Sequence, residues 1–376
     1  MEFPKFDRKK LYIRNLSERV NKLSVEKILI LPGTKPSIEN IETIRLIEES
    51  AERIIDARKN NKPVVMAFGA HVIKNGLALV INEMIKKGWI THLAGNGAVS
   101  IHDWEFSFAG ETSEDVRENV RNGCFGIWEE TGKYINLALL TGAYYGYGYG
   151  EAVGKMILHE GLEIPGPQLL EQEVCNLLSD NCGKAAAAAD LLGIIKSEQL
   201  QTGFMHIPHR WKKYSVLCAA AELNIPFTIH PMFGHDIIYT HPLNHGAAIG
   251  RTALTDFLRF VHSISNIDGG VYLSVGSAIM SPMIFEKALS MAQNIAIQEN
   301  RHIDNHFIAV VDLAKSDWDW LRNGEPPSDN PAYYMRYNKT FSRMGGTMRY
   351  ITADNRDFLT GLYNCLSEHN NHSLLA

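Results

Sequence analysis

Small and polar residues follow the apolar runs of this sequence, at positions where the strands of a parallel sheet would end. Gly69–Gly76 follows the run Val64–Phe68, and Gly95–Asp103 follows the run Trp89–Ala94. Ligands of open α/β sheets bind beyond the carboxyl ends of the strands. The backbone N–H groups of such turns can approach phosphates at the N-terminus of a helix. The spacing therefore predicts a ligand-binding edge.

Two later turns repeat this pattern. His230–Asp236 follows Phe227–Ile229, and Gly276–Ala278 follows Val271–Val275. A single turn of this kind is equally consistent with glycines that only end a strand, but four such turns favour ligand binding. The sequence contains no G-x-G-x-x-G, so the Rossmann fingerprint is not part of the prediction.

Histidines are concentrated between residues 230 and 245. The group comprises His230, His235, Asp236, His241 and His245. Histidines with a carboxylate can ligate a metal, but no H-E-x-x-H or comparable tight pair is present. Histidines also bind substrate, donate to phosphate and move protons near neutral pH. We expect no metal site here, and we expect at least two of the histidines to be structural hydrogen-bonding groups.

A proline-rich acidic loop near the C-terminal end leads into aromatic residues and a lysine. The residues that matter are Glu325, Asp329, Tyr333, Tyr337 and Lys339. Carboxylates and tyrosine faces attract ammonium groups, and a partly buried lysine has the lowered pKa that imine chemistry needs. The same residues also fit a surface loop with an ordinary solvated lysine, and taken alone they favour that alternative.

Apolar runs alternate with segments of helical periodicity along most of the chain. Strands are predicted at 64–68, 89–94, 227–229, 271–275 and 307–311, and helices at about 38–60, 76–87, 211–223, 252–263 and 283–297, with others beginning near 113 and 354. Tyr144–Gly150 is expected to be a loop, and Ala185–Ala189 to be helical. Such alternation predicts a doubly wound, mainly parallel sheet with helices on both faces, that is, a Rossmann-like α/β fold.

Composition limits the classes of function. The 376 residues are 45% hydrophobic and 21% charged, and the net charge of −5 argues against a general nucleic-acid or anionic-membrane surface. No apolar run approaches the roughly 18 residues that span a bilayer, and the first residues have no apolar core of a signal peptide. The five cysteines form no C-x-x-C pair. A reducing cytoplasm fits best.

No linker divides the chain. Residues 1–37 are therefore interpreted as an N-terminal extension, and residues 38–376 as one large domain.

Taken in order, these segments resemble the deoxyhypusine synthase family. The resemblance covers roughly residues 60–370 and is patchy between 125 and 200. Glu114–Asn119 resembles the family's arginine-glutamate-asparagine stretch, and Lys339 lies after Pro331 at the family's spacing between a proline and the catalytic lysine. The resemblance implies an NAD site formed by Ala70, His71, Gly95, Asn96, Gly97, Asp103, Gly234, Asp236, Gly269, Gly270, Gly276, Ser277, Ala353 and Asp354.

The same resemblance implies which residues act on the substrate. Glu325, Asp329, Tyr333 and Tyr337 would bind an amine or polyamine, with Lys339 and His241 as catalytic residues. The mechanism implied is oxidation of the amine to an imine by NAD, capture of the alkyl fragment on Lys339, and transfer to an acceptor amine. His241 would be the base or orienting group. Relatives are tetramers, so a homo-oligomer, with no nucleic acid or membrane partner, is expected by analogy.

Several positions depart from the family pattern. Ala70-His71 stands where the family has serine-asparagine. Two acids that hold the polyamine in the family have no match here, because their positions correspond to Tyr333 and to a residue near Pro326. Tyr337 and Asn338 replace a tryptophan and a glycine. The chain therefore resembles a divergent relative, for which spermidine specificity is in doubt.

Two further hypotheses follow. The stretch Ala94–Val99 with His102-Asp103 also resembles the NAD-binding domain of archaeal-type ornithine cyclodeaminases, of the same superfamily. That resemblance implies an NAD-dependent lyase or cyclodeaminase on a small amino acid, with Arg251, Arg336 or Arg343 anchoring the carboxylate. The missing acids favour instead a relative that binds the nucleotide without transfer activity.

Overall fold

The computed structural model describes residues 3–373, and their contacts group into two compact units. The first unit comprises Met1–Lys27, Ser100–Ala221 and Pro231–Asp256, and the second comprises Ile28–Val99, Glu222–His230 and Phe257–Ala376. The expected boundary at residue 37 coincides with no boundary between units. The single domain over 38–376 stays a prediction.

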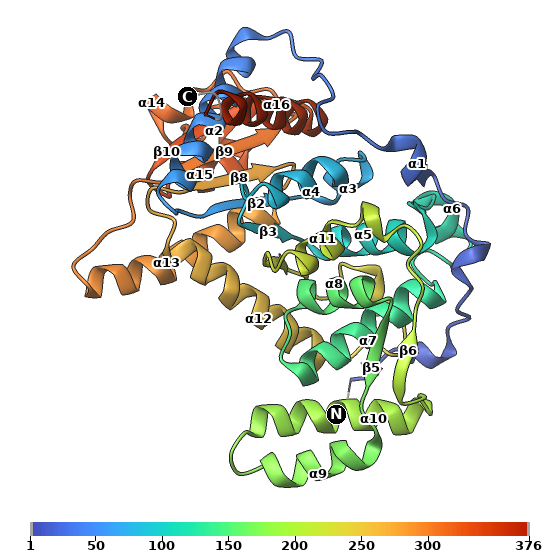
Figure 1. The fold of residues 1–376 in the computed structure, drawn as a ribbon. Coiled ribbons are helices and arrows are strands. Elements are labelled where there is room, and N and C mark those ends of the chain that lie inside the picture. Colours follow the sequence, from blue (N-terminus) through green and yellow to red (C-terminus); the bar gives the residue numbers. More distant parts are fainter. Residues whose placement is uncertain (1–2, 374–376) are drawn as a thin grey trace. The chain divides into compact units, whose positions relative to one another are not determined.

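A six-stranded parallel sheet forms the centre of the second unit (Figure 1). Its strands are β2 (Val64–Phe68), β3 (His92–Gly95), β7 (Phe227–Ile229), β8 (Val271–Val275), β9 (Phe307–Asp312) and β10 (Thr347–Thr352). All residues of β2 and β8 are buried, as expected for apolar runs in a sheet covered on both faces. The bounds of β2, β7 and β8 agree with the predicted ones.

The strand order identifies the fold. The strands lie in the order β10-β9-β8-β2-β3-β7, and every neighbouring pair is parallel. Counted from the first strand in the sequence, this is the 3-2-1-4-5-6 order of the doubly wound Rossmann fold. The predicted fold class is therefore confirmed. The order reverses between β2 and β8, which makes that position the topological switch point.

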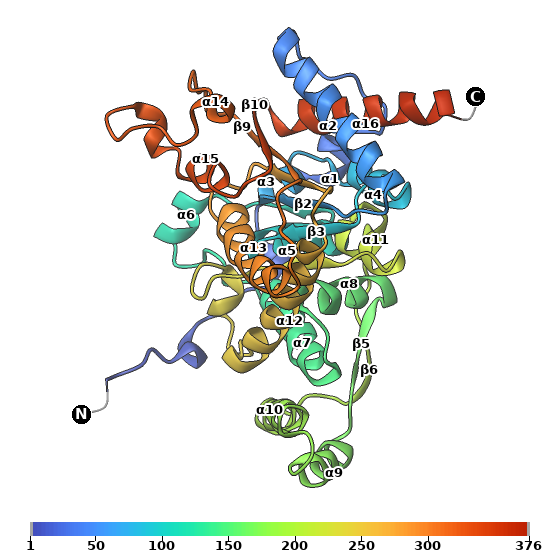
Figure 2. The same ribbon diagram turned by 90° about the vertical axis from the view of Figure 1, so that its left-hand side faces the viewer.

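Helices cover both faces of this sheet. They are α2 (Ile41–Lys59), α3 (Ala70–Lys74), α4 (Ala78–Lys86), α13 (Met280–Gln298), α14 (Trp320–Asn323), α15 (Arg336–Phe341) and α16 (Asn355–Ser373), with the 3-10 turn η5 (Pro331–Tyr334). In Figures 1 and 2, α2 and α16 lie side by side on one side of the sheet and α13 lies on the other. On the α13 side, Phe285 and Phe341 pack with Tyr272 of β8 in one apolar cluster.

The first unit is mainly helical. It contains α6 (Val116–Arg121), α7 (Glu129–Tyr145), α8 (Tyr149–His159), α9 (Pro167–Leu177) and α10 (Cys182–Glu198), the antiparallel pairs β1 (Leu23–Ser24) with β4 (Glu111–Thr112) and β5 (Gly161–Ile164) with β6 (Gly203–His206), and the 3-10 turns η1 (Arg8–Lys10), η2 (Leu16–Glu18), η3 (Lys212–Tyr214) and η4 (Ile237–Thr240). The helices α5 (Gly97–Ala109), α11 (Val216–Glu222) and α12 (Gly246–Ser265) each contain a boundary between the units, and the four-residue α1 (Val25–Ile28) contains another. The helical prediction for Ala185–Ala189 is confirmed by α10.

Two local predictions are wrong in part, and one strand was not predicted. Tyr144–Gly150 is a loop only at residues 146–148, because α7 ends at Tyr145 and α8 begins at Tyr149. A Cβ on Gly142 of α7 would lie 2.5 Å from the Cβ of Ala152 on α8, so the small residues serve close helix packing. The expected turn Gly95–Asp103 is helical from Gly97 onward, and β10, at the edge of the sheet, was not predicted because its burial does not follow a continuous apolar run.

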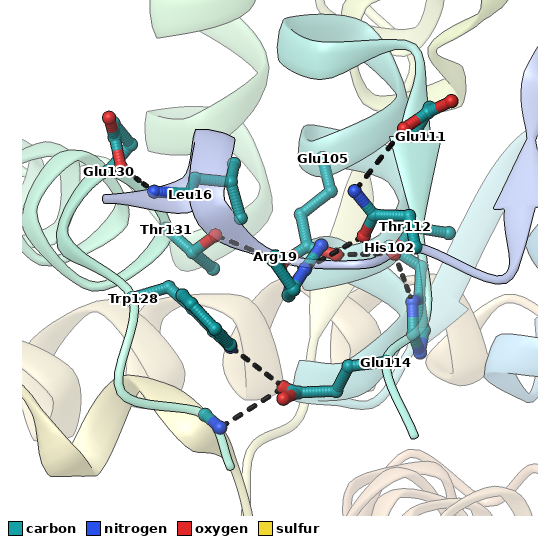
Figure 3. A network of polar contacts seen from close by, with 12 residues as sticks. Leu16, Arg19, His102, Glu105, Glu111, Thr112, Glu114, Trp128, Glu130 and Thr131 are labelled. Carbon is teal, nitrogen blue, oxygen red and sulfur yellow. Dashed lines mark hydrogen bonds and ion pairs between the residues drawn. The ribbon is translucent and has the colours of Figure 1, made fainter. Parts of the chain in front are cut away.

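A buried ion pair attaches the N-terminal segment to the first unit (Figure 3). Arg19 Nη1 lies 2.7 Å from Glu105 Oε1, and each side chain is only 1% exposed. Glu105 also accepts hydrogen bonds from the hydroxyls of Thr112 and Thr131. Because the carboxylate has three partners, this part of the predicted N-terminal extension is held in place by the fold.

Among the described residues, no helix is both long enough and apolar enough to cross a membrane.

Candidate functional site

Two backbone segments meet at the switch point of the sheet. Gly69, directly after β2, donates its N–H to the carbonyl of Val275 at 3.1 Å. A Cβ on Gly69 would lie 2.2 Å from the carbonyl oxygen of Gly276, directly after β8. Gly276 itself has a φ of +58°, which favours glycine. Neither position tolerates a side chain, so the backbone is bare where a ligand of such a sheet binds.

Two helices begin at this edge of the sheet. Gly97 starts α5 after β3, and Met280 starts α13 after β8. Asn96 caps α5 by accepting from the N–H of Val99 at 3.1 Å, and the hydroxyl of Ser277 accepts from the N–H of Ser281 at 3.2 Å. Helix N-termini carry partial positive charge and favour phosphates.

Predicted cofactor residues from the end of the chain lie at the same edge. The N–H of Ala353, after β10, donates to the carbonyl of Asp312 at the end of β9 at 3.1 Å. Asp354 forms an ion pair with Arg356 at 2.9 Å, which lowers the pKa of that carboxyl. Asn75, in the turn that contains Ala70 and His71, donates to Asn355 at 2.8 Å. The structure thus brings the turns after β2, β8 and β10 to one edge.

Gly269 and Gly270 are placed elsewhere. They immediately precede β8, so they lie at the amino end of that strand, whereas Gly276 lies at its carboxyl end. A Cβ on Gly270 would lie 2.5 Å from the carbonyl oxygen of Pro63, just before β2. Because all six strands are parallel, these two glycines are at the edge opposite to Gly276, Ser277 and Ala353.

Asp103 is a helix-capping residue in the structure. It is 1% exposed and accepts from the N–H of Val216 at 2.8 Å, from that of Leu217 at 3.1 Å and from the hydroxyl of Ser215 at 2.5 Å. Burial raises the pKa of Asp103 to about 6, although these hydrogen bonds oppose the rise. Asp103 lies within α5, and not in the turn where the cofactor contact was predicted. Its carboxylate caps α11.

His241 has both ring nitrogens occupied. Its Nδ1 accepts from the N–H of Leu243 at 3.2 Å, so the neutral ring carries its proton on Nε2 and donates to Glu129, also at 3.2 Å. Burial lowers the pKa of His241, and Glu129 opposes this effect. A Cβ on Gly132 would touch the ring at 2.7 Å. Proton transfer at His241 therefore requires one of these bonds to open.

Asp236 is a partly buried acid of the first unit. Its Oδ2 is buried and has no hydrogen-bond partner among the described residues. Burial raises the pKa of Asp236 to about 6, and only His235 opposes the rise. The preceding Gly234 has a φ of +79°, which places it in the left-handed region and shapes the loop that presents Asp236.

A hydrogen-bonded chain of histidines connects β3 with β7. Ser263 lies 2.8 Å from Nδ1 of His92, Nε2 of His92 lies 3.0 Å from Thr228, and Thr228 lies 2.9 Å from Nε2 of His230. Burial lowers the pKa of each histidine to about 3. His230 and His241 are therefore the structural hydrogen-bonding histidines that the sequence predicts. Sequence reasoning missed His92 and, for His241, Glu129.

Lys339 lies between a carboxylate and an aromatic face. Its Nζ is 3.8 Å from Glu325 Oε1 and 3.6 Å from the ring centroid of Tyr333, and its side chain is 17% exposed. Arg343 binds the same carboxylate through two nitrogens, and that contact lowers the pKa of Glu325. Asp329 is exposed and forms no ion pair with this group in the described chain. These contacts hold the ammonium of Lys339 against one carboxylate and one aromatic face.

Tyr337 lies beside this group. Its hydroxyl is 3.4 Å from that of Tyr350, which in turn donates to the carbonyl of Ala314. Burial raises the pKa of Tyr337.

Within residues 3–373, no group of three or more His, Cys, Asp or Glu side chains is placed to hold a metal.

No protein-family model matches the chain, and no curated protein matches it in sequence. Solved structures with some likeness include apo ArgZ, an arginine dihydrolase of the ornithine-ammonia cycle in cyanobacteria, with 15% identity and a TM-score of 0.42 over 86% of this chain and 32% of that one. AgrE in a ternary complex with ornithine and NAD+ has 12% identity and a TM-score of 0.44, over 89% and 34% of the two chains.

A third is a proposed deoxyhypusine synthase from Entamoeba histolytica, with 9% identity and a TM-score of 0.37 over 86% and 89%. The chain spans about a third of the length of the ArgZ and AgrE chains. With TM-scores below 0.5, these likenesses carry no argument about activity, and the strand order of the sheet identifies the fold.

Proposed function

We propose that the chain is an NAD-dependent enzyme that acts on a small amine. The observation that supports this most is the switch point between β2 and β8, where Gly69 and Gly276 meet without side chains. Sheets of this order bind dinucleotides there, because bare backbone can approach the pyrophosphate. Bound NAD would supply the acceptance and return of a hydride.

The residues that would hold NAD come from three turns. The turn that begins at Gly69 and the start of α13 after Gly276 would face the pyrophosphate. Asp354 would pair with a ribose hydroxyl, the role that an acid at a strand end commonly has in Rossmann folds. Because Asp103 and Asn96 already cap helices, they would support the site by holding α11 and α5 in place.

The amine would bind at Glu325 and Tyr333. In the structure these two groups hold the ammonium of Lys339, so they already form the acid-plus-aromatic environment that a substrate ammonium needs. Glu325 and Tyr333 would thus replace the two acids that are missing from the family pattern.

Lys339 would act as the covalent catalyst. Bound NAD would supply hydride acceptance, so that the substrate amine would become an imine. The neutral Lys339 amine then adds to that carbon and expels the original amine, and an acceptor amine later displaces the lysine before hydride returns.

The proposal is tested first by NAD binding. NAD should raise the melting temperature of the full chain by mass action, and product analysis with NAD plus spermidine or ornithine should then show turnover of an amine. Turnover of spermidine by transfer supports a transferase like deoxyhypusine or homospermidine synthase, whereas ammonia release from ornithine supports a lyase. Absence of any shift at millimolar NAD would refute the cofactor assignment.

The lyase is the second candidate, but two of the three arginines proposed to anchor its substrate carboxylate are already paired with acids. Arg251 is paired with Asp190, and Arg343 with Glu325, so only Arg336 of the three proposed anchors is exposed without an ion pair in the described chain. A homo-oligomer, tetrameric by analogy, and a cytoplasmic location belong to the same proposal.

A further inference from the structure

A cavity lies at the amino edge of the sheet. Its volume is about 450 Å³, and it is bounded by the starts of β8, β9 and β10 and by the last turns of α2. The proposed NAD site is at the carboxyl edge, and all six strands are parallel, so the cavity is at the opposite edge of the same sheet. Its volume falls within the range of small-molecule sites.

A buried histidine without hydrogen bonds lines this cavity. His306 is 2% exposed, and neither ring nitrogen has a hydrogen-bond partner among the described residues. The backbone of Met344 is near enough to oppose the lowering of the His306 pKa by burial, but it lacks the geometry of a hydrogen bond. A Cβ on Gly346 would lie 3.0 Å from Nε2, so no side chain fits on that side. Both ring nitrogens are shielded from solvent, so His306 closes one wall of the cavity and presents no hydrogen-bonding group to it.

The cavity also contains two positive charges with weak or no partners. Lys62 forms no ion pair in the part of the chain that the structure describes. Arg53 lies 3.9 Å from Glu49, but Glu49 is already bound by Arg349 at 2.8 and 2.9 Å. Both cations therefore have charge available for an anionic group of a ligand.

One negative charge in the cavity is likewise available. Asp268 is not that charge, because its Oδ1 already accepts hydrogen bonds from the N–H groups of Asp304 at 3.0 Å and Asn305 at 2.7 Å. Asp56 is exposed and has no ion pair among the described residues. It lies in the last turn of α2, where the helix carbonyls also favour a cation. The cavity thus offers both signs of charge to one ligand.

We infer that this cavity binds a small polar α-amino acid. The carboxylate would accept hydrogen bonds from Lys62 and Arg53, and the ammonium would pair with Asp56. The side-chain amide of Asn305, which also lines the cavity, would serve a polar ligand side chain. The site is separate from the NAD-binding edge, so the inference does not depend on the proposed function.

Calorimetry on the full chain tests the charge requirement. The probe is L-glutamine, compared with glutaramate, which lacks the ammonium, and with 4-aminobutanamide, which lacks the carboxylate. We expect one glutamine per chain and a loss of at least about tenfold in affinity for each analogue. Equal binding of either analogue, or no binding of glutamine at millimolar concentration, would overturn the assignment.

Two substitutions place the ligand. Lys62→Met and Asp56→Asn should each weaken glutamine binding about tenfold or more, because each removes one charged partner from an accessible side chain. Arg45→Met is the matched control, since Arg45 is an exposed residue of the same helix that pairs with Glu42 outside the cavity. Binding that survives both cavity substitutions contradicts the inference. The thermal shift by NAD should persist in all three variants, so failure here is distinguishable from failure of the proposed function.

Discussion

The carbonyl oxygen of Gly276 occupies the space that a Cβ on Gly69 would need, at a separation of 2.2 Å. The two glycines directly follow β2 and β8. They are 207 positions apart in the chain, yet the two strands are adjacent in the sheet. Their contact is backbone against backbone, so relaxation of a flexible side chain cannot relieve a clash there. The bare switch point is therefore sensitive to a single methyl group.

Gly69→Ala should test this contact. Overpacking should lower the free energy of unfolding by about 1–3 kcal/mol, and the shifted turn should abolish the rise in melting temperature with NAD. Gly193→Ala on α10 is the control, because nothing lies within 4 Å of its added methyl group. Thermal unfolding with and without NAD gives both readouts. A Gly69→Ala protein of full stability with an unchanged shift would contradict the geometry.

Borohydride trapping tests Lys339. With NAD and a turnover substrate, reduction should leave a covalent adduct on Lys339, detected by peptide mass spectrometry, because only an imine at that amine is reduced to a stable bond. Lys339→Ala should lose turnover and keep NAD binding. Lys287→Ala, which changes an exposed lysine paired with Glu286, is the control. Full turnover by Lys339→Ala would remove the covalent role.

Arg19→Met should be strongly destabilising. It leaves the Glu105 carboxylate buried and without its cation, which costs about 3–5 kcal/mol in comparable buried pairs. Denaturant unfolding measures the change. Adding Glu105→Gln should recover part of the loss, since the unpaired charge is then gone. Equal stability of the single variant and the wild type would show that Arg19 does not anchor the N-terminal segment.

Acid should destabilise the fold through His92 and His230. Burial holds the pKa of both near 3 in the folded chain, whereas an unfolded histidine titrates near 6.5. Below about pH 6.5 the unfolded chain takes up protons that the folded chain does not, so stability falls with decreasing pH. Each histidine contributes up to about 1.4 kcal/mol per pH unit.

The measurement is the free energy of unfolding between about pH 4.5 and 7. His92→Gln should reduce the slope, although it lowers stability at neutral pH by breaking the bonds to Ser263 and Thr228. Gln298→Ala, at an exposed position without a titratable group, is the control and should leave the slope unchanged. A slope that is the same in all three proteins would contradict the assignment.

The sequence by itself determined five of the six strands of the parallel sheet and the class of fold. The continuous apolar runs at β2, β7 and β8 predict their bounds, because strands buried on both faces need apolar residues at every position. The turns after these strands predict a ligand-binding edge, because ligands of open α/β sheets bind beyond the carboxyl ends of the strands. The lysine cluster is also local: Glu325, Tyr333 and Lys339 lie within 15 residues of one another. Taken alone, these residues favoured a surface loop with a solvated lysine, and only the family resemblance implied a site there.

Only the tertiary structure decided which of these residues meet. Periodicity does not encode strand order, so the contact of Gly69 with Gly276 and the placement of Gly269 at the opposite edge followed from the sheet alone. Asp103 caps a helix that begins 113 positions later, and the partner of His241 is Glu129, 112 positions away. Such partners are chosen by the packing of whole elements. A buried carboxylate or imidazole takes the hydrogen-bonding group that packing brings within reach, wherever that group lies in the chain.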